Sequence, residues 1–153
     1  MNTIEQLKGL FHYNAWANRR IVAALVENEC SKCRRIFSHL LDTEQEYFDR
    51  LWGKDSTGHD FWPPQSMQEC GILASQVATR FETLLAGLNE ESLDAIAAYR
   101  TSEGVARENT WRELLTHTII HSSTHRGNIM LKLRESGFPP PAIDYIIYLR
   151  EKK

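Results

Sequence analysis

Three histidines spaced four residues apart lie in a segment whose apolar residues recur at helical intervals. The histidines are His117, His121 and His125, and the apolar residues around them are Leu114, Leu115, Ile119, Ile129 and Leu133. This spacing predicts an amphipathic helix, in which positions i and i+4 lie on one face, one turn apart. Two imidazoles in that relation can bind one metal ion, as they do in paired-histidine zinc helices. The segment therefore predicts a long helix with a metal-binding face.

Only two of these histidines can share an ion. His117 and His125 are about 12 Å apart along a helix axis, whereas metal–nitrogen bonds are about 2 Å long. The apolar stripe of the helix centres near Leu115 and Leu133. His125 lies closest to that stripe, His121 on its flank and His117 nearly opposite. The inward-facing pair is therefore His121 with His125.

Composition and charge exclude several classes of protein. The chain has 153 residues, of which 42% are hydrophobic and 25% charged, and we expect one soluble globular domain over residues 1–153. A net charge of −2 gives no electrostatic footprint for nucleic acid. No apolar run approaches the roughly 18 residues that span a bilayer, and the N-terminal segment lacks the pattern of a signal peptide. We therefore expect a cytoplasmic protein that binds neither nucleic acid nor membranes.

The cysteines predict neither a disulfide framework nor a metal site of their own. There are three of them, and an odd number argues against a disulfide framework. Cys30 and Cys33 form a CxxC pair. A zinc knuckle would need a second ligand pair, and only Cys70 and His59 are available, at scattered spacing. Because the βαβ pattern of a redox motif is also missing, we interpret the CxxC as a chance occurrence where a helix begins.

Four amphipathic segments predict four long helices. Sequences typical of capping boxes occur at Thr3–Gln6, Ser66–Glu69 and Thr110–Glu113. The helices are expected at about 3–27, at about 32–52, from 66 through about 88, and from 110 to about 136. Gly137 and the prolines at 139–141 end the last of them.

The connections between these helices predict the rest of the fold. Segments 95–99 and 105–109 flank a turn at 102–104 and predict a short β-hairpin between the third and fourth helices. In the loop 53–65, Phe61 and Trp62 are expected to pack on the helices. The last segment, 142–150, is expected to form a helical turn or two. The predicted fold is all-α, a four-helix bundle whose long connections permit non-sequential packing.

Several residues in these helices allow two interpretations. Asn14 and Asn18 fall on the inward stripe of the first helix, either facing a polar site or lying at the edge of the core. The edge is favoured because a stripe boundary is imprecise. His39 falls on the flank of the second helix, where a partly exposed histidine is the usual case. Gly127 either lets backbone or a ligand approach closely or serves helix–helix packing.

Several blocks of sequence resemble the DinB/YfiT-like family over nearly the whole chain. They are Tyr13–Asn18, Ser38–Leu41, Glu46–Leu51, His117–Asn128 and Gly137–Asp144. The resemblance implies an up-down-down-up four-helix bundle, often a homodimer, with one metal-binding histidine from the second helix and two from the fourth. On this sequence the ligands would be His39, His121 and His125, of which the last two are also the inward-facing pair. Asn128 stands where a glutamine is common in the family.

The proposed ligand set restricts the chemistry. Three neutral imidazoles leave a coordination position open, as in catalytic zinc sites, and imidazole suits nickel as well as zinc. The open position could hold a water molecule of lowered pKa or a thiolate. Relatives include thiol-dependent S-transferases and isomerases, so we expect a metal-dependent transferase that uses a low-molecular-weight thiol, or a hydrolase-type enzyme. The alternative is a stress-related, metal-stabilised binding module without catalysis.

Other residues and other kinds of site are less well supported. His117, Asn14 and Arg126 are weaker candidates for contacts with the ligands or the substrate. For Arg126, the favoured interpretation is a surface or salt-bridge residue. The chain has no Glu-x-x-His pair and no HExxH motif, which disfavours a di-iron carboxylate site and a metalloprotease.

Overall fold

The computed structural model of the chain describes residues 2–153, and within them it is mostly helical with one small antiparallel hairpin. The helices are α1 (Thr3–Glu27), α2 (Ser31–Leu51), α3 (Met67–Ala86), the 3-10 helix η1 (Glu91–Asp94), α4 (Trp111–Glu135) and α5 (Tyr145–Lys152). The strands are β1 (Ile96–Arg100) and β2 (Ala106–Thr110). The expected all-α class with a hairpin between the third and fourth long helices is thus found.

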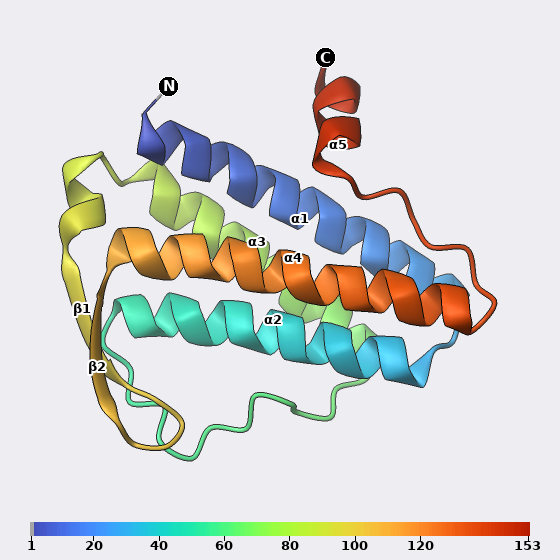
Figure 1. Cartoon of the computed structure of the whole chain (residues 1–153), viewed down its shortest axis with the longest axis horizontal. Helices are drawn as coiled ribbons and strands as arrows, with labels where there is room; N and C mark the ends of the chain where they lie inside the picture. Colours follow the sequence, from blue (N-terminus) through green and yellow to red (C-terminus); the bar gives the residue numbers. More distant parts are fainter. Residues whose placement is uncertain (1) are drawn as a thin grey trace.

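The four long helices lie side by side and contact one another in pairs. Helix α2 packs against α4 and α3, and α1 packs against α3 and α4. Figure 1 shows α1 and α4 running in one direction, α2 and α3 in the other, and the hairpin lying across one end of the helices. The loop between α2 and α3 runs along the outer side of α2 (Figure 1). This arrangement places side chains of α2 and α4 opposite each other.

Local side-chain hydrogen bonds set the helix starts. The capping boxes expected at Ser66 and Thr110 are present at α3 and α4. At α1 the prediction is wrong by one residue, because Asn2 with Glu5 forms the capping box and not Thr3 with Gln6. The hairpin strands also lie one residue later than predicted. Gly137, with φ of +83°, follows α4 as expected, in a conformation that glycine adopts without strain.

Two apolar clusters form the core, and a polar layer separates them. The cluster toward the hairpin includes Ile4, Leu7, Phe11, Leu51, Phe81, Leu114 and Leu115. The cluster toward the other end includes Ile21, Leu25, Phe37, Leu40, Leu41, Ile129 and Leu133. Between them lie buried polar side chains from three helices, namely Asn14 and Asn18 of α1, Glu44 of α2, and Ser122 and Arg126 of α4. We call these five residues the polar layer.

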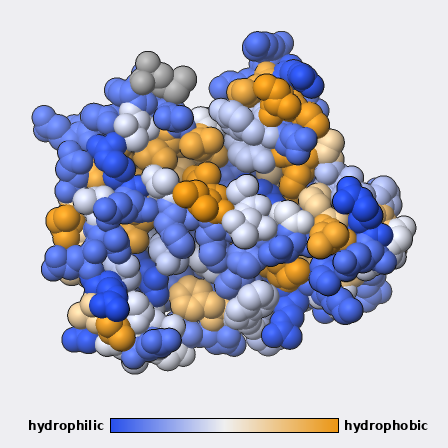
Figure 2. Space-filling model, in the orientation of Figure 1, coloured by the Kyte–Doolittle hydropathy of each residue, from blue (hydrophilic) through white to orange (hydrophobic). Residues whose placement is uncertain are grey.

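Helix α5 is attached to α1 by aromatic rings and polar contacts. The Tyr13 ring meets Tyr145 and Tyr148 edge-on, and its hydroxyl donates to the carbonyl of Ile143 at 2.6 Å. No residue of α5 is buried in the described structure. Figure 2 shows hydrophobic surface gathered over α5, where Ile146 is 53% exposed. The expected helical tail is therefore present but lies on the surface.

The CxxC pair forms a disulfide, contrary to the prediction. Cys30 and Cys33 are bonded, with their α-carbons 5.2 Å apart. Cys30 is also the N-cap of α2, and its sulfur accepts a hydrogen bond from the backbone nitrogen of Cys33. The odd number of cysteines was misleading because one turn at a helix start is enough to bring two of them together. Cys70 is free and buried, and burial raises the pKa of its thiol to about 11.

Within residues 2–153, no helix combines the length and the apolar character that a membrane crossing requires.

Candidate metal centre

The structure brings together the three histidines that were predicted as ligands. His39 comes from α2, and His121 and His125 come from successive turns of α4. The ring centroid of His39 lies 5.1 Å from that of His121 and 4.7 Å from that of His125. One nitrogen from each ring lies within 4.8 Å of the others. The pair predicted from helical periodicity, His121 and His125, is thus the pair of α4 that lies next to His39.

His39 is held in place by the loop between α2 and α3. It is 7% exposed, so the expectation of a partly exposed residue on the helix flank is wrong. Its Nδ1 donates to the carbonyl oxygen of Phe61 at 2.6 Å, which leaves Nε2 as the free nitrogen. The Trp62 ring stacks on the His39 ring at 3.8 Å between centroids. The loop therefore covers the site and sets the tautomer of His39.

The two histidines of α4 are poised as neutral imidazoles. Burial, together with the charges of neighbouring histidines, lowers the pKa of His121 to about 3. Its Nδ1 is buried and has no hydrogen-bond partner within residues 2–153. Burial followed by the charge of His39 lowers the pKa of His125. The side-chain amide of Asn128 lies 3.3 Å from Nδ1 of His125 and can present either its oxygen or its nitrogen there.

His117 stands apart from the cluster. Its ring stacks on Tyr47 at 4.6 Å and lies 5.8 Å from the ring of His121. Burial, with a smaller contribution from the charge of Arg50, lowers the pKa of His117. Its place beside the cluster agrees with the axial spacing, which excludes His117 and His125 from sharing one ion.

The full length of the chain, residues 1–153, matches the DinB family. The chain belongs to the DinB family. It is similar to Protein DinB of Bacillus subtilis (strain 168), with 24% identity over 157 residues that cover 92% of this chain and 91% of the relative. The resemblance inferred from the sequence blocks is thus confirmed, and the histidine cluster of this DinB-family chain fits a metal-binding protein of that family.

The polar layer lies directly beside the histidines and corrects two predictions. Asn14 and Asn18 are buried, and both accept hydrogen bonds from the guanidinium of Arg126, which is 1% exposed. Neither asparagine lies at the core edge, and Arg126 is not a surface residue. Glu44 accepts from Asn18 at 3.1 Å and from Ser122 at 2.8 Å. Burial raises the pKa of Glu44 and lowers that of Arg126, because both groups lose contact with water.

The layer fixes α4 against α2 next to the site. Ser122 and Arg126 each follow a histidine of the cluster by one residue. Ser122 bonds to Glu44 of α2 directly, and Arg126 reaches Glu44 through Asn18. The register between the two helices that carry the histidines therefore depends on these polar contacts.

A second charged group anchors the loop that covers the site, and sequence reasoning missed it. His59 lies with its Nε2 2.7 Å from Asp42, and Lys54 lies 2.8 Å from Glu46. Burial raises the pKa of Asp42, although His59 partly opposes this shift. Asp42 and Glu46 follow His39 by three and seven residues on α2, so helical spacing places all three on one face.

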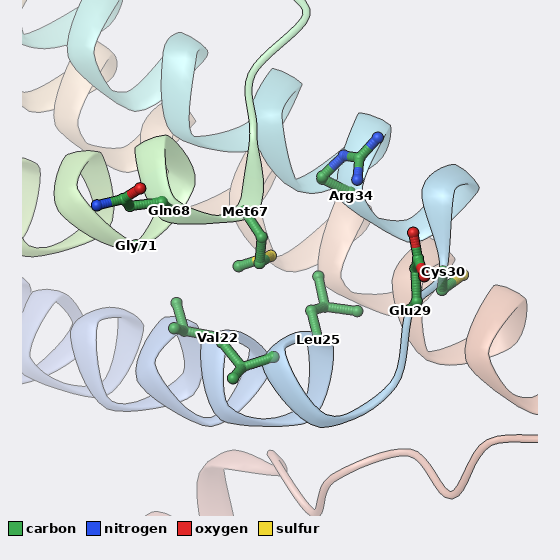
Figure 3. A pocket seen from close by; sticks show the side chains of 9 residues that line it. Val22, Leu25, Glu29, Cys30, Arg34, Met67, Gln68 and Gly71 are labelled. Carbon is green, nitrogen blue, oxygen red and sulfur yellow. The ribbon is translucent and has the colours of Figure 1, made fainter.

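An apolar pocket lies elsewhere in the DinB-family fold and does not include the histidines. Its volume is about 500 Å³, and its lining residues are Val22, Leu25, Val26, Glu29, Cys30, Arg34, Met67, Gln68 and Gly71 (Figure 3).

The structure also tests the two interpretations of Gly127, namely close approach of backbone or ligand and helix–helix packing. A Cβ built at Gly127 meets no atom within 4 Å, so the structure supports neither close packing nor close approach of backbone there.

Proposed function

We propose that His39, His121 and His125 bind one divalent metal ion and that this ion is the functional centre of the protein. The observation that carries the proposal is the convergence of three imidazole nitrogens within 4.8 Å from two different helices. Two nitrogens on one tetrahedral zinc ion, at about 2.0–2.1 Å each, are about 3.4 Å apart. Small rotations of the side chains would bring the cluster to that spacing. The four long helices would then act as the up-down-down-up bundle that carries the site.

The residues present fit a metal ion in three ways. The buried Nδ1 of His121 lacks a partner within residues 2–153 and is the kind of atom that coordination satisfies. The lowered pKa values of His121 and His125 keep the imidazoles neutral, as ligation requires. The carbonyl of Phe61 orients His39, which is the usual role of a partner of a ligating histidine. The donor set suits zinc or nickel.

The proposed activity is that of a metal-dependent enzyme acting with a low-molecular-weight thiol, as a transferase, or with water, as a hydrolase. An ion on three neutral imidazoles would supply an open position that lowers the pKa of a coordinated thiol or water molecule. The chain's own residues exclude water on one side, because Trp62 covers the His39 ring. They also hold the helix register, through Glu44, Ser122 and Asn18. We also propose that the protein is cytoplasmic and forms a homodimer.

The second candidate function is a metal-stabilised binding module without catalysis. The observation that favours it is that the ligands come from α2 and α4, whose buried faces an ion would join. In that case the ion contributes to folding alone. The two functions differ in whether the open position accepts a ligand.

The test of the site is metal content and affinity in matched variants. Wild type and His12→Ala, which removes an exposed histidine of α1, should each bind one divalent ion per chain. His121→Ala should bind at least about tenfold more weakly. Equal affinity in the two variants would remove the site. For the two functions, the cobalt(II)-loaded protein is titrated with thiols, because a thiolate–cobalt absorption band indicates an accessible open position and its absence supports the module.

A further inference from the structure

A groove lined by cations begins where α2 begins and extends to Trp62, whose ring stacks on His39 of the histidine cluster. Its volume is about 830 Å³. The side chains of Lys32, Arg34 and Arg35 line it, together with Ser38 and Trp62. No carboxylate is among the lining residues, and none of the three cations forms an ion pair within residues 2–153. We call this feature the cationic groove.

The positive charges lie at a helix end that already carries positive potential. All three cations fall within the first five residues of α2. The N-terminal end of a helix favours anions and disfavours cations. Helices α1, α3 and α4 each have a glutamate in the first turn, whereas α2 has no acidic residue there. The sequence thus breaks a local rule of helix stability here, as functional sites often do, and an anion would relieve the repulsion.

A second helix start, that of α3, faces the same space and adds to its positive potential. Ser66, the N-cap of α3, also lines the groove. Figure 3 shows the guanidinium of Arg34 pointing away from the apolar side chains Leu25 and Met67 of the neighbouring pocket. Arg34 lines both cavities, and this orientation leaves its charge outside the apolar one.

Two lining residues of the groove, Arg35 and Trp62, lie next to the histidine cluster. Arg35 precedes His39 by four residues on α2, which places the two on one face and about 6 Å apart along the axis. The guanidinium of Arg35 lies 5.5 Å from the centroid of the Trp62 ring, and that ring stacks on His39. An anion beside Arg35 would therefore be within one to two helical turns of the cluster.

We propose that the cationic groove binds a carboxylate or phosphate group of the substrate, whose reacting end lies at the three histidines. This inference rests on the proposed metal site and narrows its substrate to small anionic molecules. Lys32 and Arg35 supply the charge, and Arg34 supplies the far wall. A neutral thiol of the same size would lack these contacts and bind more weakly.

The first experiment compares two thiols on the cobalt(II)-loaded protein. 3-Mercaptopropionate carries a carboxylate and 2-mercaptoethanol does not. The thiolate–cobalt band should give an affinity for 3-mercaptopropionate that is higher by about tenfold or more, because charge-assisted hydrogen bonds to Arg and Lys are strong. The double variant Lys32→Ala/Arg35→Ala should lose this preference, while Arg19→Ala, an exposed arginine of α1, should keep it. Equal affinities in wild type, or a preference that survives in the double variant, would overturn the proposal.

The second experiment separates failure of the groove from failure of the metal site. If cobalt does not bind, the metal proposal fails, and calorimetry with inorganic pyrophosphate and with succinate decides the groove. In this experiment the His121→Ala variant, which lacks one proposed metal ligand, should still bind at least one of these anions. The triple variant that also carries Lys32→Ala and Arg35→Ala should not bind them. No heat with either anion, or equal binding after the double substitution, counts against the groove. The anion that binds more tightly identifies a phosphate or a carboxylate ligand.

Discussion

The substitution Arg126→Met tests whether the polar layer holds the helices in register. Arg126 donates to Asn14 and Asn18, and it is the cation of the layer in which Glu44, 2% exposed, is the carboxylate. Methionine fills a similar length without charge or donors. The substitution leaves the Glu44 carboxylate among neutral donors such as Asn18 and Ser122.

Two estimates of the cost agree. Removing one partner of a directly paired buried ion pair destabilises a protein by about 3–5 kcal/mol, and this range is an upper bound here because Arg126 is connected to Glu44 through Asn18. Loss of two hydrogen bonds from a charged donor, at about 1.5–3 kcal/mol each, gives about 3–6 kcal/mol. We therefore expect the free energy of unfolding to fall by about 4 kcal/mol. In a chain of this size that corresponds to a melting temperature lower by about 8–16 °C.

Urea and thermal unfolding, followed by circular dichroism, measure this change. The matched substitution Arg19→Met, at an exposed position of α1, should change stability by no more than about 0.5 kcal/mol. The pKa of Glu44 is already raised by burial and should rise further in Arg126→Met. Glu44 then carries a proton in the folded state at pH values where the unfolded chain has lost it. The deficit of the variant should therefore shrink as the pH falls toward 4.5.

A loss of stability below about 1 kcal/mol in Arg126→Met would refute this account of the layer. The double variant Arg126→Met/Glu44→Gln adds an internal check. Its cost should be smaller than the sum of the two single costs by at least about 1 kcal/mol. Each single variant leaves one buried charge without the opposite charge, whereas the double variant removes both charges. Strict additivity would show that the two side chains do not act together.

Three further predictions concern the site and its surroundings. His121 takes up a proton in the unfolded chain as the pH falls through about 6.5, whereas its pKa in the folded protein is about 3. The metal-free protein should therefore lose stability in urea titrations as the pH falls below 6.5. In the His121→Ala variant, stability should depend less steeply on pH. Trp62→Ala removes the ring stacked on His39 and should weaken metal binding by about tenfold in competition with a chelator, whereas Trp52→Ala, at an exposed tryptophan, should leave it unchanged. Reduction of the Cys30–Cys33 disulfide, which closes a loop of four residues, should cost about 2 kcal/mol and lower the melting temperature by about 4–8 °C; an unchanged melting curve with dithiothreitol would contradict it.

Features encoded by neighbouring residues could be predicted from the sequence. The caps at Ser66 and Thr110 depend on a glutamate three residues away, and the pair His121 and His125 depends only on helical periodicity. The cap of α1 was assigned one residue too late because Asn2 with Glu5 and Thr3 with Gln6 have the same spacing. Local patterns thus located the helices but did not decide which of two adjacent residues is the N-cap.

Features that need a distant partner could not be predicted. Asn18 is buried because Arg126, 108 positions later in the chain, supplies its donor. The same contact explains why Arg126 is buried, against its usual preference. The buried His39 donates a hydrogen bond to a carbonyl oxygen 22 residues later in the chain. Neither periodicity nor composition contains that information, and for His39 the family resemblance was the only signal available.

The hydrogen bond from His39 to the backbone of Phe61 has a consequence for how the site matures. A free imidazole in solution exchanges its proton between two nitrogens, so an unfolded chain offers a cation either one at random. Closure of the α2–α3 connection removes that choice by giving one nitrogen a permanent acceptor. The order in which the chain folds therefore decides which nitrogen of His39 faces the cluster, and closure of the α2–α3 connection is the step that selects Nε2.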